Sequence, residues 1–367
     1  MSAALELKNF IQERADQLIN KGLSFGIEHE FFLFNGTKTA SLNDSQLFLN
    51  EFSKRKGWKK YLDKNNLIDK VGYDEKNGYH ALKYEYPPHM LEIAIGYSRD
   101  YEEFNKKTLL LLSEIEETAN SIGLRVVHTP SIPNANIDKK SLKKMESKQL
   151  QLHYNRKKIA FDKNIYDENI YEFPSRIAAT QIHIGGFNWI ENDNFLEKVY
   201  IYEPIVNYLI LSLFEAPQKT FKERWQGYNN LFDDFKLFGF PGKDKWGFDL
   251  WKKELLLEFK SKGKDQNIIE FINNSRDLQL IRPKTYGTLE FRSTPGLDNI
   301  KNFDYLCRIR IAQCLCAENS EFKPFSYKES KHIWNDIFAS PAKYKKQIDD
   351  FITVANQQLI SKGFKEI

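Results

Sequence analysis

Four short segments of the chain alternate between apolar and polar residues. A period of two is typical of β-strands that bury one face, because successive side chains point to opposite sides of a strand. The polar positions hold Glu, His, Gln and Arg, whereas a plain solvent-facing side would carry more Lys, Thr and Ser. The segments are residues 26–32, 90–95, 180–184 and 287–292.

The alternation assigns the polar residues of each strand to one face and its apolar residues to the other. One interpretation is an ordinary antiparallel sheet whose polar face lies in water. The other is that the four polar faces converge on one concave site. Strand by strand, these polar residues are Glu28 and Glu30, then Glu92, then Gln181 and His183, and finally Thr288, Glu290 and Arg292.

The rest of the chain predicts further strands and several helices, without a repeat or a linker rich in Gly, Ser or Pro. We therefore expect one α+β domain over residues 1–367. The predicted helices are 9–20, 45–62, 101–123, 193–214, 301–318 and 342–362, and the predicted strands are 24–34, 79–85, 90–96, 125–128, 178–186 and 285–293.

Composition narrows the class of protein. The chain has 367 residues, 41% of them hydrophobic, and a net charge of +4, which is too even a balance to indicate nucleic-acid binding. Residues 1–22 lack the apolar core of a secretory signal. The most apolar stretch, 200–216, contains Glu203, Pro204 and Asn207, so we expect a buried helix and not a membrane span. These features favour a cytoplasmic protein.

The three cysteines lie within ten residues of one another in a predicted helix. They form no spaced set of pairs and no CxxC motif, so reduced thiols in the core are the expected state. The residues are Cys307, Cys314 and Cys316.

Two segments are candidate covers for a site. Residues 139–158 carry eight Lys or Arg and one acid, which indicates either a solvated helical face or a lid over a polyanion such as ATP. Residues 235–251 are aromatic and contain three glycines, so they form either a mobile cover or a static surface loop.

If the polar faces converge, their carboxylates repel one another and stay ionised only if cations compensate them. Carboxylate, amide and imidazole groups suit Mg²⁺ or Mn²⁺, and Mg²⁺ commonly accompanies a phosphate substrate. Arg292 would then neutralise phosphate charge. The chain has no Walker A motif and no GxGxxG that opens a helix. An ATP site would therefore be a metal cage on a sheet.

The four strands also resemble the glutamate–cysteine ligase family, including its bacterial carboxylate–amine ligase branch. The sequence Gly26-Ile27-Glu28-His29-Glu30-Phe31 resembles the family's GxExE(F) opening, and Leu91-Glu92-Ile93-Ala94 its second acidic strand. The segment 179–185, with Thr180 and His183, is similar to its TxxH strand. Arg282-Pro283 followed by 287–292 is similar to its RP…GTxExR segment. The four motifs occur in the family's order between about residues 24 and 293.

The resemblance implies a glutamine-synthetase-like fold, in which a curved antiparallel sheet forms a funnel backed by helices. It also implies an ATP-dependent ligase that joins an amino-acid carboxylate, most simply glutamate, to an amine such as cysteine or another amino acid. The implied cofactors are ATP and Mg²⁺, with Mn²⁺ as an alternative.

The resemblance further implies roles for individual residues. The metal ligands would be Glu28, Glu30, Glu92, His183 and Glu290. Arg292 would stabilise the transferring phosphoryl group, with Glu28 and Glu290 also catalytic. The candidates for binding ATP or substrate are Arg282, Arg176, Gln181 and the rim acid Glu85, although a surface salt bridge would equally explain Arg176.

Three positions depart from the family pattern and leave the substrates open. They are His29, where an acid is common, Gln181, where a second histidine is frequent, and Pro295, where an aspartate is frequent. Two rival functions are a metal-dependent phosphohydrolase and an inactive homologue that only binds ATP or an amino acid. Neither the substrate pair nor the oligomeric state follows from the sequence.

Overall fold

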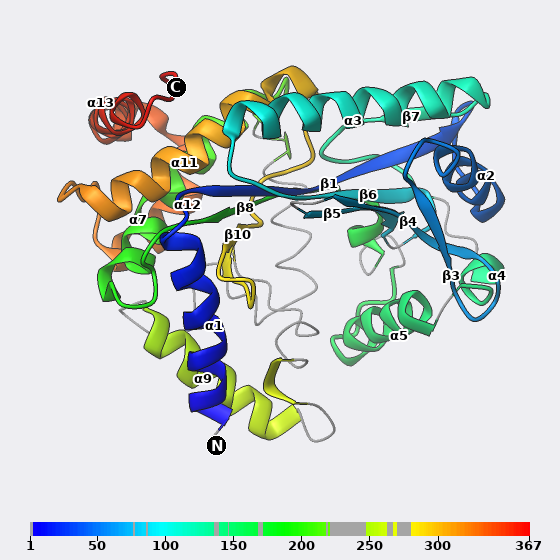
Figure 1. Ribbon diagram of the computed structural model, residues 1–367, viewed down its shortest axis with the longest axis horizontal. Helices are drawn as coiled ribbons and strands as arrows, with labels where there is room; N and C mark the ends of the chain where they lie inside the picture. Colours follow the sequence, from blue (N-terminus) through cyan, green and yellow to red (C-terminus); the bar gives the residue numbers. More distant parts are fainter. Residues whose placement is uncertain are drawn as a thin grey trace.

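The computed structural model is built on one open, antiparallel sheet covered by helices (Figure 1). The structure describes residues 3–75, 78–85, 87–135, 139–145, 147–167, 172–217, 219–220, 247–262, 267–269 and 280–367. Within these residues the sheet has ten strands in the order β3-β4-β5-β6-β1-β8-β10-β9, with β2 and β7 also paired to β1.

The strands are β1 (Ser24–Asn35), β2 (Lys38–Thr39), β3 (Lys59–Leu62), β4 (Ile68–Glu75), β5 (Gly78–Tyr84), β6 (Met90–Ser98), β7 (Arg125–Val127), β8 (Thr180–Gly185), β9 (Ile281–Pro283) and β10 (Leu289–Phe291).

The α-helices are α1 (Ala3–Ile19), α2 (Leu42–Phe52), α3 (Tyr101–Ser121), α4 (Lys139–Leu142), α5 (Ser147–Asp162), α7 (Asp193–Leu211), α9 (Phe248–Lys262), α11 (Phe303–Asn319), α12 (Tyr327–Ala339) and α13 (Lys345–Ser361). Short 3₁₀ helices are η1 (Phe173–Arg176), η2 (Ile300–Asn302) and η3 (Pro341–Tyr344).

Helices cover the apolar face of the central strands. Figure 1 shows α3 and α11 above the sheet, while α1, α9 and α5 lie on the opposite side. Phe25 and Phe31 of β1 are buried against the helices, with ring centroids 6.0 Å from Phe104 of α3 and 6.5 Å from Phe48 of α2. The polar residues of β1 therefore face the side of α1, as the period-two pattern predicts.

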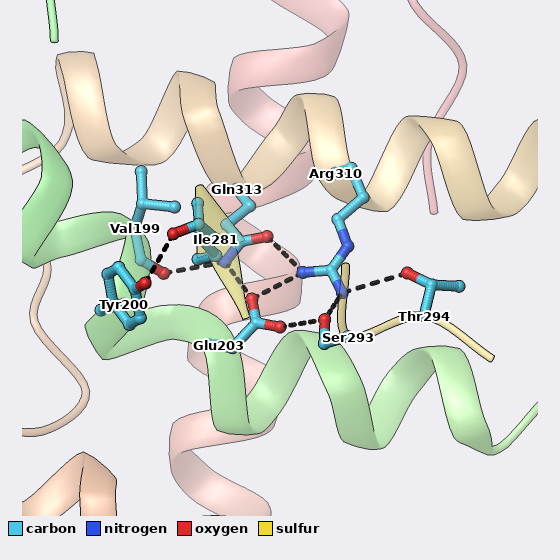
Figure 2. A network of polar contacts seen from close by, with 8 residues as sticks. All are labelled: Val199, Tyr200, Glu203, Ile281, Ser293, Thr294, Arg310 and Gln313. Carbon is cyan, nitrogen blue, oxygen red and sulfur yellow. Dashed lines mark hydrogen bonds and ion pairs between the residues drawn. The ribbon is translucent and has the colours of Figure 1, made fainter. Parts of the chain in front are cut away.

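A buried polar network joins α7 and α11 behind β10 (Figure 2). Arg310 donates to Glu203 Oε2 at 2.6 Å and to the Ser293 hydroxyl, and both charged side chains are fully buried. Gln313 Nε2 donates to the same Glu203 oxygen at 2.7 Å and to the Val199 carbonyl at 2.8 Å. The network thus fixes Ser293 to two helices.

Several predicted elements are confirmed, but others are wrong or were missed. The predicted helix 45–62 stops at Phe52, with Ser53 as its C-cap, and the chain then turns through Gly57, at φ +88, into β3. The predicted strand 285–293 is reduced to β10, since Gly287 at φ +83 lies in a turn. The strands β3, β4 and β9 and the helices α9 and α12 had no counterpart in the prediction.

The three cysteines are buried and free, as expected, and burial raises the pKa of the Cys316 thiol to about 12. Residues 139–145 and 147–158 contain the helix α4 and most of α5. In the aromatic segment, residues 235–246 lie outside the described residues, and Phe248–Trp251 belongs to α9 and not to a loop. Across the described chain, no helix has both the length and the apolarity needed to cross a bilayer.

Replacing Arg310 with Met should destabilise the protein by about 3 to 5 kcal/mol, because the Glu203 carboxylate would remain buried without its cation. Urea unfolding followed by circular dichroism measures this loss. The matched control is Lys345→Met, which breaks an exposed pair with Asp349 one helical turn away and should change stability little. Equal, small effects of both substitutions would contradict a structural role for the buried pair.

Stability should fall as the pH drops below 6.5, in part because of His89. Burial lowers the pKa of His89 to about 4, from 6.5, although its Nε2–H donates to the Ser175 carbonyl at 3.2 Å. Between these values the unfolded chain binds a proton that the folded chain excludes, so up to about 3 kcal/mol is present above pH 6.5 and is lost toward pH 4.

The substitution His89→Gln should therefore weaken the dependence of the unfolding free energy on pH between 6.5 and 4.5. His332, exposed on α12, provides the control, and His332→Gln should leave the wild-type dependence in place. If His89→Gln keeps the wild-type dependence of the unfolding free energy on pH, the buried imidazole does not cause that dependence.

Candidate functional site

Three polar side chains from adjacent strands form one cluster, which we call the imidazole cluster: Glu28 of β1, His183 of β8 and Glu290 of β10. Pairing between the strands places His183 directly opposite Glu290, and Glu28 opposite Gln181. His183 Nε2 lies 3.4 Å from Glu28 Oε1 and 3.8 Å from Glu290 Oε1. One ligand atom from each residue lies within 4.8 Å of the others.

A second group, the carboxylate cluster, consists of Glu30, Glu85 and Glu92. Glu30 of β1 is paired directly with Glu92 of β6, and Glu85 follows the end of β5. Their nearest oxygens also lie within 4.8 Å of one another. Glu30 Oε2 additionally accepts a hydrogen bond of 2.7 Å from the Ala179 amide, which holds this carboxylate against the start of β8.

The donor atoms of both clusters suit a divalent cation. Mg²⁺ and Mn²⁺ prefer carboxylate oxygens, and Mn²⁺ also accepts imidazole nitrogen. Within the described residues, His183 Nε2 and Glu290 Oε2 are buried and make no hydrogen bond, although charged groups lie near them. An ion bound among these atoms would satisfy both.

Burial and neighbouring charges shift the pKa values of Glu28 and Glu290 in opposite directions. Burial alone would raise the pKa of Glu28, but contact with the His183 imidazole and the charges of Lys284 and Lys83 outweigh it and lower that pKa. For Glu290, Arg292 and Lys284 similarly overcome burial and lower the pKa.

The pKa of Glu92 is shifted upward, unlike those of Glu28 and Glu290. Burial and the nearby carboxylates raise its pKa well above the ordinary value, although the Lys83 ammonium opposes them. Burial of Glu92 beside other acids therefore disfavours its charged form unless a cation lies next to it.

Two lysines that the sequence analysis did not single out lie at the clusters. Lys83 Nζ is 2.9 Å from Glu92 Oε1 and 3.1 Å from Glu85 Oε1. Lys284 Nζ is 3.2 Å from Glu290 Oε1. The sequence did contain a signal for Lys83, since it precedes Glu85 by two residues in the predicted strand 79–85, where the two would share a face.

The other predicted site residues occupy different surroundings. Arg292 Nε lies 3.9 Å from Glu290 Oε2, and the buried Arg282 is paired with Glu290 across β9 and β10. Gln181 is buried beside Glu28 in the same sheet register. Arg176 lies in η1, where its guanidinium donates to the Pro133 carbonyl at 3.1 Å.

Two of the departures from the family pattern, His29 and Pro295, are members of neither cluster. His29 points to the helix-covered side, where its Nδ1 is 2.9 Å from the Thr180 hydroxyl and its Nε2 is 2.9 Å from His128 Nδ1. Pro295 forms a bridge with Ala179 at the start of β8. His29 therefore does not take the place of an acid on the polar face.

A pocket of about 440 Å³ opens beside the imidazole cluster and was also missed from the sequence. Small residues of the central strands form part of its lining, and cationic and aromatic side chains form another part. The small residues are Ser24, Gly26, Ala94 and Gly96; the cations are Arg14, Lys21 and Arg99; the aromatic residues are Tyr79, Tyr97 and Tyr286; and Glu28 and His183 complete the cluster side.

Helix α1 reaches the pocket because Gly287 allows close contact. A Cβ atom at this position would lie 2.7 Å from the Ala15 backbone nitrogen, and φ is +83. The Trp189 indole donates to the Gly287 carbonyl at 3.1 Å and holds the turn in place. A larger residue at 287 would push α1, and with it Arg14, away from the sheet.

Neither a protein-family model nor a curated protein sequence matches the chain. Solved structures similar to it include the following three. One, described as a novel glutamine synthase homolog, has 12% identity and a TM-score of 0.36, and the match covers 96% of this chain and 71% of that one. A ligand-free structure of GmaS has 11% identity and a TM-score of 0.37, with 97% and 73% covered. A glutamate–cysteine ligase from Francisella tularensis in complex with AMP has 11% identity and a TM-score of 0.49, with 92% and 78% covered.

Divalent cations should raise the melting temperature of the protein, because a ligand that binds only the folded state stabilises it. We expect this increase with millimolar Mg²⁺ or Mn²⁺ in differential scanning fluorimetry, and we expect Glu28→Gln or Glu290→Gln to remove most of it. The exposed Glu117 of α3 provides the control substitution, Glu117→Gln. An equal increase in all four proteins would place metal binding elsewhere.

Proposed function

We propose that the protein is an ATP-dependent ligase that joins an amino-acid carboxylate to an amine through an acyl phosphate. The observation that carries this proposal is the pair of acidic clusters on one sheet face, built from Glu28 and Glu30 two residues apart, with Arg292 beside Glu290. Adjacent cation sites next to a guanidinium are the arrangement that phosphoryl transfer needs.

The reaction divides a difficult substitution into two steps. A free carboxylate is a poor electrophile, because its charge repels nucleophiles and oxide does not leave. Its oxygen attacks the γ-phosphorus of ATP, the bond from that phosphorus to the β–γ bridging oxygen breaks, and ADP leaves. The amine then attacks the acyl carbon, inorganic phosphate departs, and the amine loses a proton as the amide forms.

Residues of the imidazole cluster would hold a divalent ion, which offsets the charge of the phosphates when bound, and the carboxylate cluster provides a second site for a cation. Arg292 lies at the edge of the imidazole cluster, where its planar fork suits the equatorial oxygens of the transferring group. Arg282 and Lys284, on the same side of β9 and β10, add positive charge for phosphate or for a substrate carboxylate. Water has to be kept out, since it would hydrolyse the acyl phosphate.

The pocket next to the imidazole cluster is the proposed nucleotide site. Its cations, Arg14, Lys21 and Arg99, suit a triphosphate, and its tyrosines offer flat faces to a base. Its small residues allow a planar group to approach the strands. The acid substrate would then react on the side of the carboxylate cluster. By the family resemblance, glutamate is the expected acid and cysteine or another amino acid the expected amine.

The decisive experiment measures phosphate release from Mg-ATP against a panel of amino acids and amines, singly and in pairs, with mass spectrometry of the products. A new amide mass that requires one acid and one amine supports the ligase. Hydrolysis of phosphate esters without an amine would instead indicate a phosphohydrolase. ATP binding without turnover across the panel would indicate the inactive, binding homologue.

The substitution Arg292→Lys should lower kcat by at least about tenfold while changing the Kd for ATP much less, because lysine cannot reproduce the two-pronged contact with the phosphoryl oxygens. Steady-state phosphate release and calorimetric ATP titration measure the two quantities. The control is Arg308→Lys, on α11 and paired with Asp304. Equal losses of kcat and ATP affinity in the Arg292 variant would contradict a role in the transition state.

A further inference from the structure

Lys83 reaches the carboxylate cluster from β5. It is paired with Glu92 across β5 and β6, so both side chains project on the polar face of the sheet. Its Nζ bridges two of the three carboxylates, 2.9 Å from Glu92 Oε1 and 3.1 Å from Glu85 Oε1. The Glu92 side chain is only 3% exposed, and a carboxylate this deeply buried requires a compensating charge.

The two clusters differ in how their protein cations are placed. In the carboxylate cluster, one ammonium contacts two acids from within the sheet. In the imidazole cluster, Lys284 contacts one acid at 3.2 Å and comes from the turn after β9, while His183 Nε2 lies between two acids. The imidazole cluster therefore keeps a nitrogen ligand directed at its centre, and the carboxylate cluster already has a cation between its oxygens.

A divalent ion and Lys83 would compete for the same atoms. Mg²⁺ needs its oxygen ligands at about 2.1 Å in octahedral geometry. Glu85 Oε1 and Glu92 Oε1 are the oxygens that Lys83 contacts. An ion that used them would have to displace an ammonium that the sheet register places there.

We propose that Lys83 is the resident cation of the carboxylate cluster and takes the place of one divalent ion. The inference rests on the proposed function, because it presupposes that the imidazole cluster binds a metal ion. The wild-type chain then binds one divalent ion tightly, at Glu28, His183 and Glu290. Lys83 supplies the positive charge beside Glu30, Glu85 and Glu92 and is available to an anionic substrate there.

The test counts tightly bound Mn²⁺ on the full chain by electron paramagnetic resonance of the free ion and by calorimetry. We expect one ion in the wild type and a second in Lys83→Met, with the affinity of the carboxylate cluster raised by about tenfold or more. The control is Lys59→Met, which removes the same charge from the exposed strand β3 and should leave one ion.

A second variant keeps the proposal testable if Lys83→Met does not fold. Glu85→Gln removes a carboxylate that Lys83 bridges, and the wild-type count of one ion should persist. A fall from two ions to one would show that the cluster binds metal and would overturn the inference.

The number of bound Mn²⁺ ions distinguishes an error about Lys83 from an error about the metal-dependent ligase. Two ions of unchanged affinity in both the wild type and Lys83→Met, or one ion in both, would overturn the role of Lys83 and leave the ligase standing. No bound Mn²⁺ in any of these proteins would instead count against the metal-dependent function.

Discussion

Glu30 and Glu92 lie directly opposite each other in the middle of the β1–β6 pair, and the site depends on how the fold tolerates this contact. Like charges facing each other across strands destabilise a sheet. Here the Ala179 amide holds one carboxylate and the Lys83 ammonium the other. The remaining repulsion is offset by the opposite face of the same strands, where apolar side chains such as Phe31 are completely buried.

Two neighbouring residues just after β10 also lie on opposite sides of the sheet. Arg292 and Ser293 are neighbours in sequence, but one lies beside Glu290 on the polar side and the other is bound by Arg310 behind the sheet. The buried Glu203–Arg310 pair gains its rigidity from hydrogen bonds at both ends (Figure 2). A guanidinium meant to meet a developing charge benefits from such an anchored backbone, because preorganised donors need not move during the reaction.

Period-two alternation was sufficient to predict the polar faces of β1, β6 and β8, because it depends only on strand geometry. It could not show that Glu85, a rim acid by the sequence, joins Glu30 and Glu92, because only the three-dimensional fold brings the three together. Lys83 was overlooked because a lone lysine in a strand resembles a solvent-facing residue until its register is known. The helix predicted at 45–62 was too long at its C-terminal end, because the chain leaves the helix after Phe52 and turns through residues 53–57 into β3. The roles assigned to the metal and substrate residues remain predictions.

The motif around Glu290 combines residues that supply charge with a residue, Gly287, that allows close packing. Glu290 and Arg292 supply charge, whereas Gly287 supplies only space: its missing side chain lets the turn after β9 touch the backbone of α1. That contact brings Arg14 to the wall of the pocket, opposite strands whose own residues there are small. A residue with no chemistry of its own thus determines the shape of the site. This short motif therefore specifies both the shape of the pocket and the charged groups beside it, and the site requires both.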